Sequence, residues 1–267
     1  MKNGSPFAVV ALFACFLVAP AAAEEIVILE GRNGVTLRIA VMEQASPAGG
    51  VILFPGGSGK LKLAKGKKFL NKTGNFAIRV RQRFFHAGFT VVSADVPSDR
   101  KHLHGFRPSP DHAEDIGKII SWLRQKVSGP IWLIGHSRGS ISAANASARL
   151  GSAPAGPDGI VLMASVTQTS NDGKPTVYDA HLDRISQPAI VVHHRDDECY
   201  VTPLYGALSL AKRVKTDVIR ITGGKPPIAR PCQSKSEHGF FGKEAKTIRK
   251  TVAEIRRLSA GRAPSGN

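Results

Sequence analysis

Residues 131–144 read IWLIGHSRGSISAA, and they contain the strongest structural signal in the chain. The apolar run 131–134 is typical of a strand that is buried on both faces of a parallel sheet. Gly135 and Gly139 flank Ser137, and glycine permits a strained turn and a close approach of two backbones. The small residues that follow allow a helix to pack tightly. The pattern therefore predicts a strand, a sharp turn and a helix, with the Ser137 hydroxyl exposed at the turn.

Similar short apolar runs alternate with helical patterns along the rest of the chain. Further strands are predicted at 26–30, 35–42, 51–54, 89–94, 160–164, 189–193 and 218–221. Helices are predicted around 76–84 and at 112–127, 138–150, 204–214 and 245–258. The first two strands flank a GRNG turn, which suggests an antiparallel hairpin. We therefore expect an α/β fold, with a mostly parallel central sheet, helices on both faces and an antiparallel N-terminal hairpin.

Size and composition indicate one folded domain. The chain has 267 residues, of which 42% are hydrophobic and 21% are charged, so it can bury a large core and is not a disordered protein. The 37 Lys and Arg residues against 20 Asp and Glu give a formal net charge of +17. No internal apolar run reaches about 18 residues, which a transmembrane helix would need. We expect a single domain over 24–267, with a frayed tail at 259–267.

Residues 1–23 have the organisation of a signal peptide. Lys2 supplies a positive charge, the 13 residues 7–19 are apolar, and 21–23 form an AAA cleavage signal. Cleavage there predicts a periplasmic or secreted protein. The alternatives are a buried core helix and a lipoprotein anchored at Cys15.

Cleavage would leave two cysteines, Cys199 and Cys232. An even pair in an oxidising compartment predicts a disulfide bond between them. Two separate buried thiols are the alternative.

Serine is a weak nucleophile that needs a neighbouring base, and the base needs an orienting acid. The chain provides both, in the order Ser, Asp, His. Asp196 and Asp197 follow the penultimate predicted strand at its carboxyl end, and either could be the acid. His238 lies on a loop between the last predicted strand and the last helix, and it is the candidate base. His136, next to Ser137, is expected to pack or to form a hydrogen bond instead.

Together these motifs resemble the α/β-hydrolase superfamily over nearly the whole mature chain, in particular dienelactone-hydrolase-like and esterase-like serine hydrolases without a large cap. Residues 194–203, with the pattern H-x-x-D-x-x-x-V-x-P, are similar to the family's acid loop, and 238–240 to its histidine loop. The resemblance implies Asp197 as the acid, with Asp196 as the competitor, and His238 as the base. It implies no particular substrate, because this fold hosts many reactions.

The resemblance also implies an oxyanion hole made of two backbone N–H groups. One belongs to Arg138, the residue after the nucleophile. The other belongs to the loop after the third strand, which reads FPGGSG at 54–59. In this loop Gly57 is the expected donor and Ser58 the second choice.

A basic cluster lies between Lys60 and Lys72, and residues 59–73 contain no acid. Such a run is most often a solvated face, and the alternative is a field that attracts anionic substrates or anionic envelope polymers. Nucleic-acid binding is not expected, because the chain has no recognisable module and only 6% aromatic residues. The interval 165–188 is too short for a large helical cap. We therefore expect an open site with the 60–72 loop as its main wall.

The sequence thus predicts an exported serine hydrolase that cleaves a carboxylic ester by acyl transfer through Ser137, His238 and Asp197. The substrate would be a small-molecule or polymer-attached ester, with an anionic ester as one option. The alternatives are a thioesterase or amidase with the same triad, and a non-catalytic protein of this fold that binds an anionic envelope partner.

No cofactor and no metal ion are expected, because the histidine pairs at 102/104 and 193/194 lack further ligands at a recognisable spacing. The predicted disulfide would tie the acid loop to the histidine loop, and we hypothesise that it fixes the geometry of the acid and the base. No oligomeric state follows from the sequence.

Overall fold

The computed structural model describes residues 24–64 and 74–261. The predicted signal peptide, most of the basic cluster and the end of the expected tail lie outside the described residues. Within the described ranges, no helix has the length and the apolar character needed to cross a membrane.

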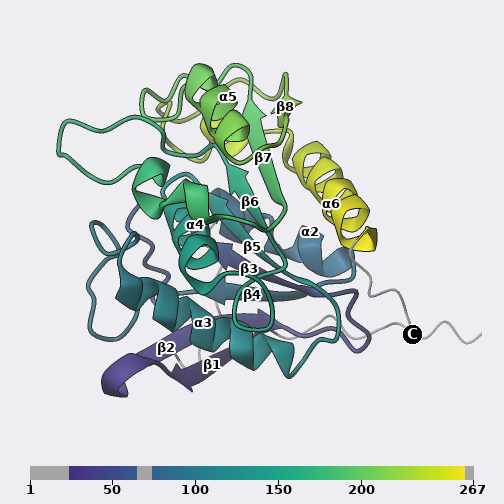
Figure 1. Cartoon of the computed structure of the whole chain (residues 1–267). Coiled ribbons are helices and arrows are strands. Elements are labelled where there is room, and N and C mark those ends of the chain that lie inside the picture. Colours follow the sequence, from purple (N-terminus) through teal and green to yellow (C-terminus); the bar gives the residue numbers. More distant parts are fainter. Residues whose placement is uncertain (1–23, 65–73, 262–267) are drawn as a thin grey trace, which may run out of the picture.

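The described strands are β1 (Glu25–Glu30), β2 (Thr36–Met42), β3 (Gly50–Phe54), β4 (Thr90–Ala94), β5 (Ile131–His136), β6 (Gly159–Met163), β7 (Ala189–His194) and β8 (Val218–Ile221). In the described part of the chain they form one sheet in the order β1-β2-β4-β3-β5-β6-β7-β8 (Figure 1). β2 pairs antiparallel with both β1 and β4, and every other pairing is parallel. The predicted fold class, including the antiparallel N-terminal hairpin, is confirmed.

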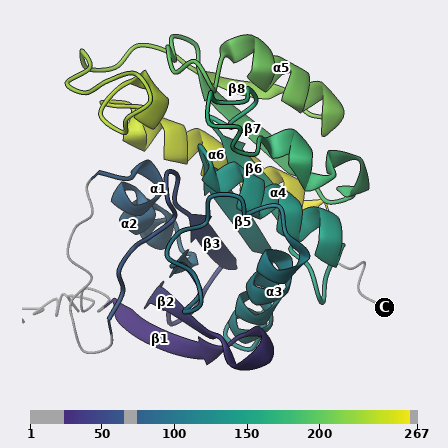
Figure 2. The ribbon, with the colours of Figure 1, turned by 90° about the vertical axis from the view of Figure 1, so that its left-hand side faces the viewer.

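Helices cover both faces of this sheet. The α-helices are α1 (Phe76–Arg79), α2 (Arg81–His86), α3 (Pro110–Arg124), α4 (Gly139–Leu150), α5 (Leu204–Arg213) and α6 (Glu244–Ala260). The short 3₁₀ helices are η1 (Arg32–Gly34), η2 (Val177–Ala180), η3 (Leu182–Arg184) and η4 (Glu237–Gly239). One apolar layer holds α3, α4 and α5, and the opposite layer holds α1, α2 and α6. Figure 2 shows α1 and α2 on the other side of the sheet from α3 and α4.

The central strand β5 explains why the apolar runs are continuous. All of its residues are buried. Ile131 and Leu133 pack into the layer that holds α3 and α4, whereas Trp132 and Ile134 pack into the layer that holds α6. Because successive side chains of a strand point to opposite faces, a strand between two helical layers must be apolar at every position.

Three helical segments differ from the predicted boundaries by more than one residue. The helix expected around 76–84 is divided into α1 and α2, because Val80 leaves the helical conformation with φ −99° and ψ 0°. Helix α3 begins earlier than expected, at Pro110, where the Ser109 hydroxyl accepts the N–H of His112 at 3.1 Å. Helix α6 continues to Ala260 and so includes the first residues of the expected frayed tail; Trp132 donates from its ring to the Ser259 hydroxyl at 3.2 Å.

The interval between β6 and β7 contains only η2 and η3 as helical elements. This interval therefore provides no large cap over the carboxyl ends of the parallel strands. At this edge of the sheet the loops after β3, β5, β7 and β8 come together, which is where open α/β sheets bind their ligands.

Candidate active site

Ser137 lies at the tip of the turn between β5 and α4, where its backbone adopts a φ of +55°, unusual for a residue other than glycine. Its N–H donates to the carbonyl of Met163 in β6 at 2.9 Å. Both flanking glycines are required by sterics: a Cβ on Gly135 would collide with the backbone of Gly139, and one on Gly139 with the carbonyl of Phe54. The turn thus holds the half-buried Ser137 side chain at the carboxyl edge of the sheet.

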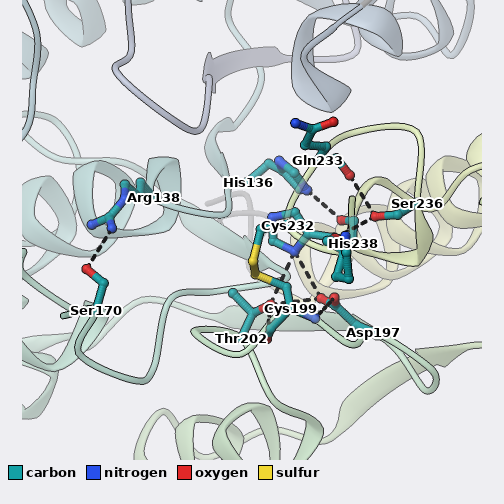
Figure 3. Close-up of a disulfide and its surroundings, with 11 residues drawn as sticks. His136, Arg138, Ser170, Asp197, Cys199, Thr202, Cys232, Gln233, Ser236 and His238 are labelled. Atoms are coloured by element: carbon teal, nitrogen blue, oxygen red, sulfur yellow. Dashed lines mark hydrogen bonds and ion pairs between the residues drawn. A yellow bond between two sulfur atoms is a disulfide. The ribbon is translucent and has the colours of Figure 1, made fainter. Parts of the chain in front are cut away.

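His238 and Asp197 form a buried pair at the same edge (Figure 3). His238 Nδ1 lies 3.0 Å from Asp197 Oδ2, and the two side chains are only 3% and 0% exposed. The pair joins η4 to the loop after β7. Asp196 is exposed and binds Arg195 instead. Of the two carboxylates that the chain order left open, Asp197 is the one that meets the histidine.

Thr202, which sequence analysis missed, completes this pair. Its hydroxyl donates to Asp197 Oδ2 at 2.9 Å and lies 3.2 Å from His238 Nδ1. The N–H of Cys199 donates to the other carboxylate oxygen at 3.0 Å. Burial alone would raise the pKa of Asp197, but the hydrogen bond and charge of His238 and the Cys199 N–H outweigh it and hold that pKa below its ordinary value. Asp197 is therefore ionised beside the imidazole ring.

His136, at the end of β5, supports the backbone of His238. Its Nε2–H donates to the His238 carbonyl at 2.9 Å. Its Nδ1 is then unprotonated, and it has no partner in the described part of the chain. Burial, together with the charge of His238, lowers the pKa of His136 to about 3, so the ring stays neutral. These contacts are those of a packing and hydrogen-bonding residue.

The loop after β3 lies directly beside Ser137. A Cβ on Gly56 would stand 3.0 Å from the Ser137 Cβ, and Gly57 adopts a φ of +59°. The N–H groups of Gly57 and Arg138 have no acceptor among the residues described. The Arg138 side chain points away to the Ser170 hydroxyl, at 3.1 Å (Figure 3). The two expected N–H donors are thus without an acceptor in the described residues, on the loop beside Ser137 and on the residue that follows it.

A cavity of about 420 Å³ opens beside Ser137 and His238. The lining residues are Gly56, Gly57, Gly74, Asn75, Phe76, His136, Ser137, Ala229, Cys232, Gln233, Ser234, Lys235 and His238. The wall expected from the sequence was the 60–72 loop, but the described wall comes from residues 229–235, between β8 and η4. Residues 65–73 lie outside the described residues. Residues 225–235 are rich in proline and in basic residues, and this composition is the sequence signal that could have predicted the wall. In the structure most of them are exposed.

The predicted disulfide between Cys199 and Cys232 is present, with Cα atoms 4.6 Å apart (Figure 3). It ties the loop that carries Asp197 to the wall of the cavity. From the other side, Arg79 donates to the carbonyls of Ser234 and Gly239, each at 2.9 Å. The disulfide and Arg79 therefore both hold the segment that carries the cavity wall and His238.

Within residues 24–64 and 74–261, no three histidine, cysteine or acidic side chains are grouped so that they could hold a metal ion. The His102 and His104 rings lie 4.6 Å apart on the loop before α3. His193 is buried in the core at the end of β7.

No protein-family model and no curated protein matches the chain. Solved structures do match over nearly their whole length. An α/β serine hydrolase without a lid from Xanthomonas campestris is 17% identical with a TM-score of 0.58, and the match covers 91% of this chain and 97% of that one. Est1E from Butyrivibrio proteoclasticus, solved with ferulic acid, is 13% identical with a TM-score of 0.56, over 86% and 98% of the two chains.

A highly thermostable carboxyl esterase from Bacillus coagulans is 13% identical with a TM-score of 0.55, over 89% of this chain and 99% of that one. Similarity at such low identity is informative about the fold and not about the reaction. The sheet order, the strained turn at Ser137 and these structural matches together show that the chain has the α/β-hydrolase fold.

Proposed function

We propose that this protein is an exported serine hydrolase that cleaves a carboxylic ester by acyl transfer. The observation that carries the proposal is that a strained Ser137 and His238, which is paired with the buried Asp197, line one cavity. A nucleophile, a base and an orienting acid on adjacent loops are the parts that this chemistry needs.

In the first half-reaction, the Ser137 oxygen attacks the ester carbonyl carbon while His238 Nε2 accepts the hydroxyl proton. The carbonyl electron pair moves onto the oxygen and gives a tetrahedral intermediate. When the intermediate collapses, the bond to the alcohol breaks and the alcohol leaves with the proton from His238. The acyl group remains on Ser137.

In the second half-reaction, water attacks the acyl-enzyme and gives its proton to His238. The second intermediate expels Ser137, which recovers that proton, and the carboxylic acid departs. The ionised Asp197 accepts the Nδ1–H of His238 throughout, which leaves Nε2 to exchange protons with Ser137 and water, and it stabilises the imidazolium. The N–H groups of Gly57 and Arg138 would stabilise the oxyanion in both halves.

The shape and polarity of the cavity support a proposal for the substrate class. Among the described residues no cap covers it, it has a volume of about 420 Å³, and its described lining includes Asn75, Gln233 and Lys235 but no acidic residue. These features suit a small or polymer-attached ester with polar or anionic groups. The disulfide is consistent with an exported protein.

The first test is intact-mass measurement after incubation with a fluorophosphonate, on the oxidised wild-type protein and on Ser137→Ala. One adduct on the wild type and none on the variant is expected, because a fluorophosphonate labels a serine that a base has activated. A panel of matched esters, thioesters and amides then distinguishes the reaction classes. A folded wild type that takes no adduct would reject the proposal and favour a binding protein of this fold.

A further inference from the structure

Arg107, on the loop between β4 and α3, is a buried arginine without a carboxylate partner. Only 2% of the residue is exposed, and within the described residues no Asp or Glu pairs with it. The other buried arginines differ: Arg32 binds Asp99 and Asp115, and Arg81 binds Glu24. A buried cation that lacks a counter-charge is costly, so its surroundings indicate what it is for.

The guanidinium of Arg107 binds the loop that lies beside Ser137. Its Nη2 donates to the carbonyl of Pro55 at 2.9 Å and lies 3.4 Å from the carbonyl of Gly57. The neighbouring N–H of Leu103 donates to the carbonyl of Ser58 at 2.9 Å. Leu103 and Arg107 therefore bind three carbonyls of this short loop.

These contacts control the direction of the loop's N–H groups. In a trans peptide the carbonyl and the following N–H point in opposite directions, so binding one fixes the other. Arg107 fixes the Pro55–Gly56 and Gly57–Ser58 peptides. The peptide between them carries the Gly57 N–H, and its own carbonyl, on Gly56, accepts the N–H of Gly59 at 3.2 Å. Glycines on both sides of this peptide make it easy to rotate, so the contacts of Arg107 on each side of it add to that hydrogen bond.

The same guanidinium also reaches the helix that begins after Ser137. Arg107 Nη1 donates to the Ser142 hydroxyl in α4 at 2.7 Å, and His112 Nε2 lies 2.9 Å from that hydroxyl. Arg107 thus connects the loop that holds one proposed oxyanion donor to the helix that begins directly after the other, Arg138.

We propose that Arg107 is a positioning residue, which aims the N–H groups of the loop after β3 at the oxyanion and adds an uncancelled positive charge behind them. This inference rests on the proposed hydrolase function. Burial, and the charge of Arg138, lower the pKa of Arg107 to about 9, so the side chain is still cationic at neutral pH. Buried and preorganised charge is effective in catalysis because it does not need to reorganise.

The test compares Arg107→Met, Arg107→Lys and wild type on one ester, and measures their affinity for a trifluoromethyl ketone and for the matching methyl ketone. The serine hydroxyl adds to the carbonyl of the trifluoromethyl ketone, and the adduct carries an oxyanion. The methyl ketone mimics only the ground state. For Arg107→Met we expect kcat/KM and trifluoromethyl ketone affinity to fall together by about 10- to 100-fold, and methyl ketone affinity to change less than about 2-fold.

Arg107→Lys should recover only part of the loss, because one ammonium group cannot span Pro55 and Ser142 as the planar guanidinium does. Arg32→Met is the matched control: Arg32 is also buried, at 5% exposed, but it binds the carboxylates of Asp99, on the loop after β4, and Asp115, in α3. It should lower the Tm and leave kcat/KM unchanged.

The outcomes separate the two ideas. If Arg107→Met lowers the Tm but retains the affinity for the trifluoromethyl ketone, Arg107 is structural and the inference is wrong. If the wild type binds the methyl ketone but forms neither a fluorophosphonate nor a trifluoromethyl ketone adduct, the hydrolase proposal fails and the inference fails with it.

Discussion

Single side chains around His238 show how one carboxylate is selected from two. Asp196 and Asp197 are adjacent, but the backbone after β7 turns Asp196 to the surface and Asp197 into the protein. There Asp197 receives three donors, from His238, Thr202 and Cys199. A buried carboxylate with this many donors stays ionised, which is the state that orients and stabilises an imidazolium.

Thr202 provides a test of this arrangement. Thr202→Val keeps the shape but removes one donor from Asp197, so the pKa of Asp197 rises and His238 is held less firmly. We expect kcat/KM to fall about 10-fold, the equivalent of one hydrogen bond to a charged group. The acidic limb of the pH profile should move to higher pH. Thr202→Ser, which keeps the hydroxyl, should recover most of the rate, and a Thr202→Val enzyme with wild-type kinetics would contradict this role.

Among the secondary-structure elements, α4 and β3 make a close backbone contact in the site. Gly139 begins α4 against the carbonyl of Phe54, so that the helix starts directly behind Ser137. The helix continues with buried small residues, which let it lie close to the sheet. The sharp turn at Ser137 therefore depends on the packing of a whole helix as well as on its own backbone.

A pair of glycine-to-alanine substitutions measures this dependence. Gly139→Ala should destabilise the protein by about 3 kcal/mol and reduce activity, because the new methyl group meets a backbone that cannot move away. Gly117→Ala in α3 should stabilise it by about 0.5–1 kcal/mol, because alanine favours helix. The new Cβ at Gly117 would only touch Leu150, at 3.4 Å. Urea unfolding of both variants checks the contrast, and equal effects would refute it.

For the molecule as a whole, buried histidines link stability to pH. Burial lowers the pKa of His112 and His136 to about 3 and that of His193 to about 4. In the unfolded chain a histidine binds a proton below its ordinary pKa of about 6.5, whereas these three stay neutral in the folded protein. Folding is therefore penalised as the pH falls below about 6.5, and the penalty grows down to the folded pKa values.

His193 isolates one part of this effect. Both of its ring nitrogens are buried, and neither has a hydrogen-bond partner among the described residues. Each such histidine should lower the free energy of unfolding by about 2 kcal/mol as the pH falls from 7.5 to 5. His193→Leu should remove about that much of the decline, as measured by urea unfolding at the two pH values. An unchanged difference between pH 7.5 and pH 5 would show that His193 is not buried as a neutral ring.

The disulfide stabilises the whole molecule by joining two distant segments. It links residues that are 33 positions apart, and a loop of this length is worth about 3–4 kcal/mol through restriction of the unfolded chain. The Cys199→Ala, Cys232→Ala variant should lose about this stability and part of its activity, since Asp197 and the cavity wall are no longer tied. Reductant should mimic the variant on wild type and have no effect on the variant. Unchanged Tm and activity would contradict the role.

Local sequence was sufficient to predict the turn at Ser137 and the α/β fold class. Glycines at 135 and 139, and continuous apolar runs between helical patterns, impose their conformation through sterics and burial within a few residues. The order of Ser137, Asp197 and His238 along the chain was also readable, because each follows a recognisable strand. The Cys199–Cys232 bridge was predicted because only these two cysteines remain after the expected cleavage.

The partners of these residues were decided only by the tertiary structure. Arg107 is 50 residues from Gly57 in the sequence. The cavity wall at 229–235 lines the same cavity as Ser137, although the two are far apart in the sequence. Nothing in the residues next to Arg107 indicates that its guanidinium will find three oxygens and no carboxylate. A local pattern constrains the backbone over a few residues, whereas a contact between distant segments depends on how all the intervening elements pack.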